Sequence, residues 1–192
     1  LCILKINLLL SEKDCGIMKN DIIKLDNFID RKTVNSAYLD LRHNFYWTVV
    51  SDKPGSNIKK AAFGRGYEHE DLVRALETIP MVSYFDEYIR NSGLPNCNRL
   101  RHFYVNCIKP GDQFNYHQDR SGSTVLMYVN PVWKWYWGSG TKFKKGFRTH
   151  FVAAKPGRCV CFPGKTDHKP VPPNLLCNDF GRLSIAFQYE LN

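Results

Sequence analysis

The run RLSIAFQYEL (182–191) decides the fold class, because it is apolar enough to be buried and rich in strand-forming residues. Runs of similar character precede it after residue 98, and clusters of Gly, Pro, Asn and Asp separate them. They are RLRHFYVNCI (99–108), TVLMYVN (124–130), THFVAA (149–154) and RCVCFP (158–163). Short strands divided by turns predict a sandwich, a barrel or a jelly roll for residues 98–192.

The first half of the chain has a different pattern. From Glu70 to Ile89 apolar residues recur at helical spacing, and Pro80 is expected to divide this stretch into two helices. Asp30 is expected to cap an earlier helix that runs through Leu41. The sequence therefore predicts an α+β protein, with helical support over residues 18–97 packed outside a β core over residues 98–192.

The N-terminal run LCILKINLLL is apolar, but Lys5 and Asn7 interrupt it. It is too short and too polar for a transmembrane helix, so we expect no membrane association. Residues 1–17 are interpreted either as an N-terminal extension or as an early strand, and residues 18–192 as a single domain. The seven cysteines are odd in number and form no CxxC pair, which is typical of a reduced, cytoplasmic protein.

The net charge of +9 comes from 27 Lys+Arg against 18 Asp+Glu. Such a surplus indicates either a solvated basic surface or an affinity for an acidic partner: nucleic acid, an acidic peptide or a small carboxylate. A short basic stretch contains Lys142, Lys144, Lys145 and Arg148, but no dense basic run favours nucleic acid. The sequence lacks a glycine-rich phosphate loop and a GxSxG motif, which argues against nucleotide-binding and α/β-hydrolase functions.

Candidate metal ligands occur in YHQDRSG, where His117 and Asp119 leave the same face of an extended strand. An imidazole and a carboxylate at this spacing suit two adjacent positions of an octahedral metal, although the pattern also arises by chance. His168, in FPGKTDHKPVPP, would complete a 2-His-1-carboxylate triad, which fits non-haem Fe(II). The alternative interpretation of His168 is a turn histidine among prolines.

Arg182 opens the last predicted strand, and Ser184 points the same way. A guanidinium beside a metal suits a bidentate bond to a carboxylate ligand, and Ser184 would donate a further hydrogen bond. Because an interior arginine is costly unless it is paired, a waiting anion explains Arg182 better than packing does. The alternative is a structural ion pair with Asp179.

Residues 98–192 resemble the Fe(II)/2-oxoglutarate-dependent dioxygenases, and among them the prolyl-hydroxylase-like branch. The resemblance is carried by the HxD motif and three further stretches, which follow in the order of that branch and cover about half of the chain. They are TVLMYVNPVW (124–133), WYWGSGTKF (135–143) and KPGRCVCFPG (155–164). This resemblance implies a double-stranded β-helix, or jelly roll, with helices outside it.

The resemblance also implies roles for individual residues. His117, Asp119 and His168 would bind Fe(II), and Arg182 would bind the distal carboxylate of 2-oxoglutarate. Further contacts to this co-substrate are expected from Tyr128, Ser184 and Thr141, and from Tyr104 on a looser match. The other implied requirements are dioxygen and, as in some relatives, ascorbate.

Two departures from the family pattern are visible. The segment Gly138-Ser139-Gly140-Thr141 lacks the acidic residue usual in that loop, and the anchor is Arg182 where collagen-type prolyl hydroxylases tend to use lysine. Position 188 is Gln, whereas nucleic-acid demethylases of the superfamily typically carry arginine there, which weakens a nucleic-acid interpretation.

We expect hydroxylation of an unactivated C–H, with a prolyl or similar residue of a peptide as first choice. A free amino acid or other small metabolite is the alternative. A different class, a cupin-like metal-binding module without oxygenase activity, would not need an arginine at position 182. Among the aromatic residues at 133–137, Trp133 and Trp137 are expected to cover a core edge, while Trp135 and Tyr136 are open to facing substrate.

Overall fold

The computed structural model of the protein describes residues 15–18, 22–45, 47–50, 62–119 and 122–190. Their strands form two sheets, and every pairing between strands is antiparallel. The larger sheet has the order β1 (Cys15–Met18), β2 (Ile22–Leu25), β9 (Cys159–Pro163), β6 (Ser123–Tyr128), β11 (Arg182–Tyr189), β5 (Leu100–Ile108), β4 (Ala62–Glu68) and β3 (Thr48–Val50). The smaller sheet has the order β10 (Asp167–Pro173), β7 (Gly138–Lys145) and β8 (Arg148–Ala153).

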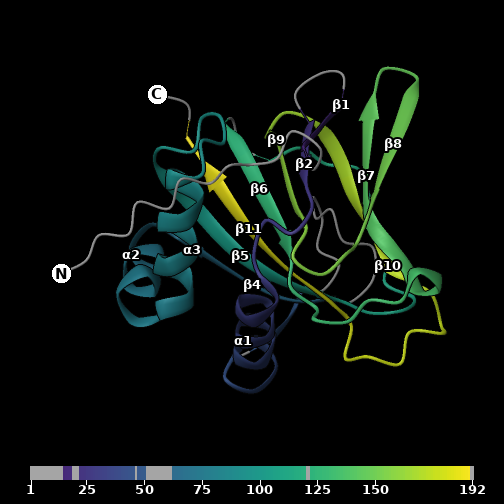
Figure 1. The fold of residues 1–192 in the computed structure, drawn as a ribbon, viewed down its shortest axis with the longest axis horizontal. Helices are drawn as coiled ribbons and strands as arrows, with labels where there is room; N and C mark the ends of the chain where they lie inside the picture. Colours follow the sequence, from purple (N-terminus) through teal and green to yellow (C-terminus); the bar gives the residue numbers. More distant parts are fainter. Residues whose placement is uncertain (1–14, 19–21, 46, 51–61, 120–121, 191–192) are drawn as a thin grey trace.

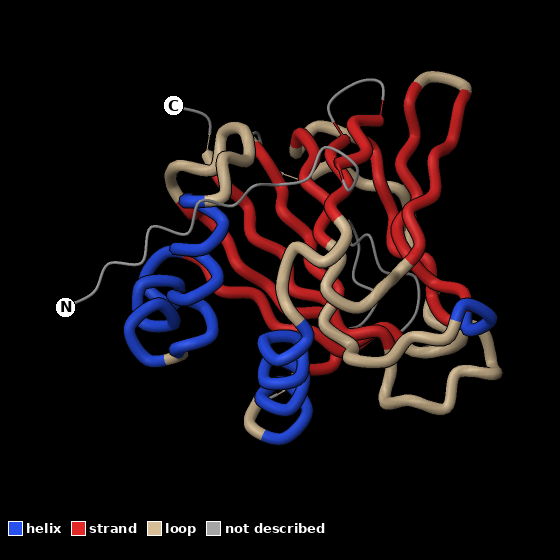
Figure 2. Tube along the Cα trace, viewed as in Figure 1, coloured by secondary structure: helices blue, strands red, loops and turns tan. Residues whose placement is uncertain are grey.

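The helices lie on the side of the larger sheet that faces away from the smaller one (Figures 1 and 2). They are α1 (Arg31–His43), α2 (His69–Thr78) and α3 (Pro80–Asn91), with a short 3₁₀ turn η1 (Trp135–Trp137) before β7. Asp30 caps α1 by accepting a hydrogen bond from the Thr33 N–H at 2.9 Å, and Pro80 starts α3 directly after α2. The predicted helices and the α+β class are therefore confirmed.

The central strand β11 is buried on both faces. Leu183, Ile185 and Phe187 pack into one core with the buried faces of the helices. The alternate residue Ala186 packs into a second core together with residues of the smaller sheet, such as Phe143 and Val152. Since side chains alternate along a strand, even-numbered residues of β11 face the space between the two sheets.

The first half of the chain contributes more than helices. Strands β1 to β4 all belong to the larger sheet, so this sheet does not begin at residue 98. The predicted division of the domain into helical support over 18–97 and a β core over 98–192 stays a prediction. Of the segment 1–17, residues 15–17 are part of β1, and the rest lies outside the described residues.

Within residues 98–192, two strands were not expected from the sequence, and both belong to the smaller sheet. β7 is rich in glycine and lysine, and β10 contains Pro170, Pro172 and Pro173. Proline is tolerated here because β10 lies at an edge of its sheet, where an absent N–H removes no necessary ladder bond. Among the described residues no helix is long and apolar enough to cross a membrane.

Candidate metal centre

The structure brings His117, Asp119 and His168 together, with one ligand atom of each within 4.8 Å of the others. His117 and His168 form a β-bridge, in which each backbone N–H donates to the other residue's carbonyl at 2.9 Å. The Asp119 N–H donates to the carbonyl of Gly164 at 2.8 Å. Backbone hydrogen bonds thus hold all three side chains at the start of β10, as the HxD spacing and the later histidine predict.

The side chains are oriented by their neighbours. Thr124 Oγ1 donates to Asp119 Oδ2 at 2.7 Å, and His168 Nδ1 lies 2.9 Å from the Thr166 carbonyl oxygen. A carbonyl can only accept, so Nδ1 carries a proton, and in the neutral tautomer with that proton Nε2 is the nitrogen with the lone pair. Nε2 lies 3.7 Å from Asp119 Oδ2. Such partners fix the tautomer and orientation of a metal-binding histidine.

Aromatic packing and burial also suit these groups to metal binding. The Phe162 and Phe143 rings lie with centroids 4.8 Å and 6.1 Å from that of His168. Burial lowers the pKa of His117, and the adjacent His168 lowers it further, against an opposing effect of Asp119. A lowered pKa favours the neutral imidazole, which is the form that binds a metal. The two nitrogen donors and one carboxylate fit Fe(II).

Arg182 is buried, with 2% of its surface exposed, and it contacts β7 at Gly140, three residues before Phe143, which pairs with His168. Its Nη1 donates to the Gly140 carbonyl at 2.6 Å, and its guanidinium carbon lies 5.4 Å from the centre of the Tyr128 ring. Nε has no hydrogen-bond partner, and among the described residues no carboxylate forms an ion pair with this arginine. Burial lowers the pKa of Arg182, as expected for a cation that lacks a counter-ion.

The alternative prediction for Arg182, a structural ion pair with Asp179, is wrong. Asp179 accepts hydrogen bonds from Tyr38 Oη at 2.6 Å and Asn130 Nδ2 at 3.1 Å, and its ion-pair contact is with Arg42 at 4.0 Å. A buried cation without a partner is costly, so Arg182 fits a site for an anionic ligand.

Further groups around Arg182 are polar and buried. Ser184 Oγ has no hydrogen-bond partner and lies on the same face of β11. Tyr128 Oη and Thr141 Oγ1 lie 2.8 Å apart, and both residues are almost fully buried. Gly140 supplies the carbonyl that holds Arg182, and a Cβ there would lie 2.1 Å from the Val152 carbonyl oxygen, so only glycine fits. This arrangement would cradle a carboxylate.

Tyr104 lies at the metal end of β11 rather than at the Arg182 end, since it pairs with Ala186. Its hydroxyl donates to Asp119 Oδ1 at 3.4 Å and accepts from Gln188 Nε2 at 3.5 Å. Burial and the Asp119 charge raise the pKa of Tyr104 well above its ordinary value, so the hydroxyl keeps its proton. Gln188 Oε1 has no partner. This position makes Tyr104 a neighbour of the metal ligand.

Sequence reasoning missed two of these contacts. Thr124 was seen only as part of an apolar run, and Gln188 only as the absence of an arginine. A signal for both exists, because each shares its strand's even-numbered face with a predicted site residue: Thr124 with Tyr128, and Gln188 with Arg182.

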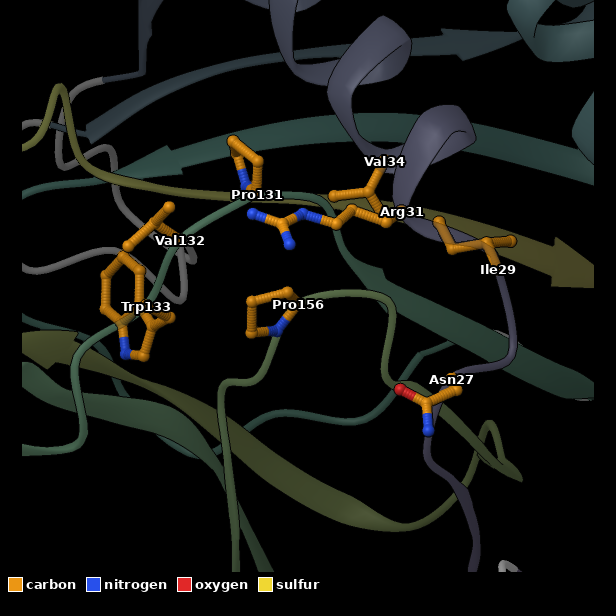
Figure 3. Close-up of a pocket in the computed structure, with 8 residues that line it drawn as sticks. All are labelled: Asn27, Ile29, Arg31, Val34, Pro131, Val132, Trp133 and Pro156. Carbon is orange, nitrogen blue, oxygen red and sulfur yellow. The ribbon is translucent and has the colours of Figure 1, made fainter.

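A separate pocket of about 390 Å³ lies at the start of α1 (Figure 3). Its lining comes from the start of α1 and from two loops: Asn27, Ile29, Arg31, Val34, Pro131, Val132, Trp133 and Pro156. None of the predicted site residues lines it. Trp133 donates its indole N–H to the Gly138 carbonyl at 2.8 Å, and Trp137 is buried, so both cover a core edge as expected.

No protein-family model and no curated protein sequence matches the chain. Several solved structures match its fold. A Pseudomonas putida prolyl-4-hydroxylase has a TM-score of 0.63 at 13% identity, over 90% of this chain and 94% of that one. A Trichoplax adhaerens prolyl hydroxylase, in complex with a peptide fragment of hypoxia inducible factor, has a TM-score of 0.63 at 18% identity, over 90% and 84%.

The fold is also similar to that of SnoK, a non-heme alpha-ketoglutarate-dependent carbocyclase from nogalamycin biosynthesis. Here the TM-score is 0.63 at 9% identity, over 90% of this chain and 80% of that one. At such identities the likeness shows the fold, which is shared by enzymes of quite different substrates. The fold alone therefore does not define the reaction, which depends on the residues of the site.

Proposed function

We propose that this protein is an Fe(II)- and 2-oxoglutarate-dependent oxygenase that hydroxylates an unactivated C–H, and that its two sheets form the jelly roll of that superfamily. The observation that carries the proposal is the buried, unpaired Arg182 beside a 2-His-1-carboxylate set. The triad alone would support only a divalent metal. The arginine adds a site for the carboxylate of a co-substrate, which a plain metal-binding module does not need.

Buried polar atoms without hydrogen-bond partners are the reason why the site would fit 2-oxoglutarate. Arg182 Nε and Ser184 Oγ are buried donors on one face of β11, and a carboxylate would accept from both. Tyr128 and Thr141 would bind or orient the same carboxylate through their hydroxyls. His117, Asp119 and His168 would hold Fe(II). When bound, iron and 2-oxoglutarate supply the activation of dioxygen for hydroxylation.

The chain's own residues would orient and shield this chemistry. Thr124 and Tyr104 both contact the Asp119 carboxylate, so that its rotation is restricted while it binds metal. The Phe143 and Phe162 rings cover His168, which is only 5% exposed, and so exclude water from that ligand. Placement of the reacting group and exclusion of competitors are the protein's main contributions to such catalysis.

For the substrate we propose a prolyl or similar residue in a peptide. The similarity in fold to a prolyl hydroxylase that binds a peptide supports this choice. The similarity to SnoK supports the second candidate, a free amino acid or other small metabolite. Use of ascorbate and a cytoplasmic location stay predictions.

The test is an anaerobic titration of the protein with Fe(II) and 2-oxoglutarate, monitored by the weak visible charge-transfer band of the chelate. We expect the band with wild-type protein and with Arg74→Met, a control at an exposed arginine of α2. We expect none with His168→Ala. An absent band in wild type, or an undiminished band in His168→Ala, contradicts the proposal.

A further inference from the structure

The hairpin that joins β7 to β8 ends in an exposed aromatic residue surrounded by cations. Phe147 is fully exposed, and Lys144, Lys145 and Arg148 beside it are exposed as well. We call residues 144–148 the hairpin tip; the hairpin projects from the rest of the molecule at the upper right of Figures 1 and 2. Because its side chain is fully exposed, Phe147 adds nothing to the core, and it offers one apolar contact among the cations of the hairpin.

The position of the hairpin tip connects it to the metal centre. β7 passes the centre at Phe143, which pairs with His168, and then continues to Lys145. Lys145 lies on the same face as Phe143 by strand alternation, and Arg148 is its partner across the hairpin. These two cations therefore lie on the metal-facing side of the hairpin, on the far side of His168 from Arg182.

The cations of the hairpin tip are available to a ligand. Among the described residues, no acidic side chain forms an ion pair with Lys145 or Arg148. Lys145 and Arg148, which are opposite each other in the hairpin, therefore keep their charges free of an ion pair within the described part of the chain. A ligand with negative charge would be attracted to both cations.

The larger sheet carries acidic residues at the Gln188 end of β11, where Glu68 pairs in register with His102. His102, opposite Gln188, has its ring 5.1 Å from that of Tyr104, the residue that contacts Asp119. From His102 a groove of about 650 Å³ continues outward, and its other lining residues are Gly66, Glu68, His69, Glu70 and Asp71. This acidic side would repel a continuous polyphosphate. A peptide can carry acidic residues only where it contacts the hairpin tip and none where it contacts the acidic groove. A basic and an acidic surface together therefore favour a peptide ligand over nucleic acid.

We propose that the hairpin tip is a substrate-recognition arm that binds an acidic segment of a peptide whose neighbouring residue reaches the metal centre. This inference rests on the proposed function and narrows its substrate class. Lys145 and Arg148 bind the acidic side chains, and Phe147 packs on an apolar part of the peptide. The binding is electrostatic in large part, so it weakens as salt is added.

The experiment measures binding by fluorescence anisotropy on the full chain, loaded anaerobically with Fe(II) and 2-oxoglutarate. Three labelled probes are compared: a peptide with a central proline flanked by aspartates, the same peptide with lysines, and single-stranded oligothymidylate of similar length. We expect the acidic peptide to bind best. Lys145→Glu should weaken it roughly fivefold, because an attraction becomes a repulsion, and Phe147→Ala should weaken it about twofold to threefold.

The matched control is Lys32→Glu on α1, an exposed position with the same change in net charge, which should leave binding unchanged. The inference is overturned if the lysine peptide binds as tightly, if oligothymidylate binds more tightly, if no peptide binds, or if Lys32→Glu acts like Lys145→Glu. Its failure is distinct from that of the proposed function. A normal charge-transfer band without preference for the acidic peptide removes only this inference.

Discussion

The two faces of β11 differ in what their side chains contact. On the helix side, Leu183, Ile185 and Phe187 are completely buried in the larger core. On the side that faces the smaller sheet, Arg182, Ser184 and Gln188 are buried as well, but each has a polar atom without a partner. One strand therefore carries a packed apolar face and a polar face that is incomplete in the protein alone.

The two faces of β11 therefore contribute to stability in opposite directions: the helix side stabilises the fold, and the side that faces the smaller sheet destabilises it. Buried polar groups without partners cost free energy, whereas buried apolar side chains are the main source of it. A carboxylate ligand would satisfy two of these groups, Arg182 and Ser184, whereas Gln188 lies beside Tyr104 at the metal end of the strand. The comparison makes opposite predictions for substitutions on the two faces.

The largest effect on stability is expected from Phe187→Ala, on the helix side. This change leaves a cavity among Phe85, Phe103 and the rest of the core, and should lower the free energy of unfolding by about 3–5 kcal/mol. Phe147→Ala, at an exposed phenylalanine, is the control and should change it by less than about 0.5 kcal/mol. Denaturant unfolding measures both, and equal effects would remove the distinction between core and surface.

On the other face, Thr124→Val should loosen the metal centre without unfolding the protein. Valine has the shape of threonine but leaves Asp119 Oδ2 without its hydrogen bond. Loss of such an orienting partner typically weakens metal binding about 10-fold to 100-fold. Anaerobic titration with Fe(II) measures this, with Thr149→Val, at an exposed position of β8, as control. Unchanged affinity in Thr124→Val would show that Asp119 does not need this bond.

A smaller effect on stability is expected at Asp26, which follows β2 of the larger sheet. Here, in contrast to Arg182, a partly buried arginine forms an ion pair with a carboxylate. Arg158 Nη2 and Lys155 Nζ donate to Asp26 Oδ2 at 3.0 Å and 3.3 Å. The hydrogen bond and charge of Arg158 lower the pKa of Asp26 from 3.8 to about 2, so the carboxylate stabilises the fold above pH 4 and this contribution is lost as the pH falls toward 2.

Asp26→Asn should therefore lower the free energy of unfolding by about 1 kcal/mol at neutral pH. The effect is small because Asp26 and Arg158 are partly exposed, and solvent weakens their attraction. The difference between wild type and variant should close between about pH 4 and pH 2. Denaturant unfolding at several pH values measures it. A difference that is constant with pH would mean that the contribution of Asp26 is not electrostatic.

Within residues 98–192, the sequence predicts the strands of the larger sheet better than those of the smaller one, whereas β1 to β4 lie in the half of the chain that was expected to be helical. β5, β6, β9 and β11 are apolar or β-branched runs whose burial is intrinsic to their composition. Only β8 of the smaller sheet was expected. β7 and β10 form because the chain on either side of them is held in place, and their glycines and prolines locally indicate loops.

The sequence predicts the residues that would bind the metal and the co-substrate. It does not predict the side-chain contacts that orient them. His117 and Asp119 follow from the alternation of side chains along a strand, His168 from the third ligand that a 2-His-1-carboxylate set needs, and Arg182 from the cost of an unpaired interior guanidinium. The bond from Thr124 to Asp119 and the open Gln188 Oε1 depend on how distant strands are paired in register. Strand register is a tertiary property, so no local pattern specifies these contacts.

The central claim is that Arg182 is a buried cation kept for a carboxylate ligand, and Arg182→Met tests it most directly. The measurement is the free energy of unfolding with and without 2-oxoglutarate, in the presence of Fe(II) and absence of oxygen. Without 2-oxoglutarate we expect the variant to be as stable as wild type or more stable, because an unpaired buried charge is removed. With 2-oxoglutarate only wild type should gain stability, because affinity in the variant falls about a hundredfold. A variant that is strongly destabilised alone, yet stabilised by 2-oxoglutarate as much as wild type, would contradict the account.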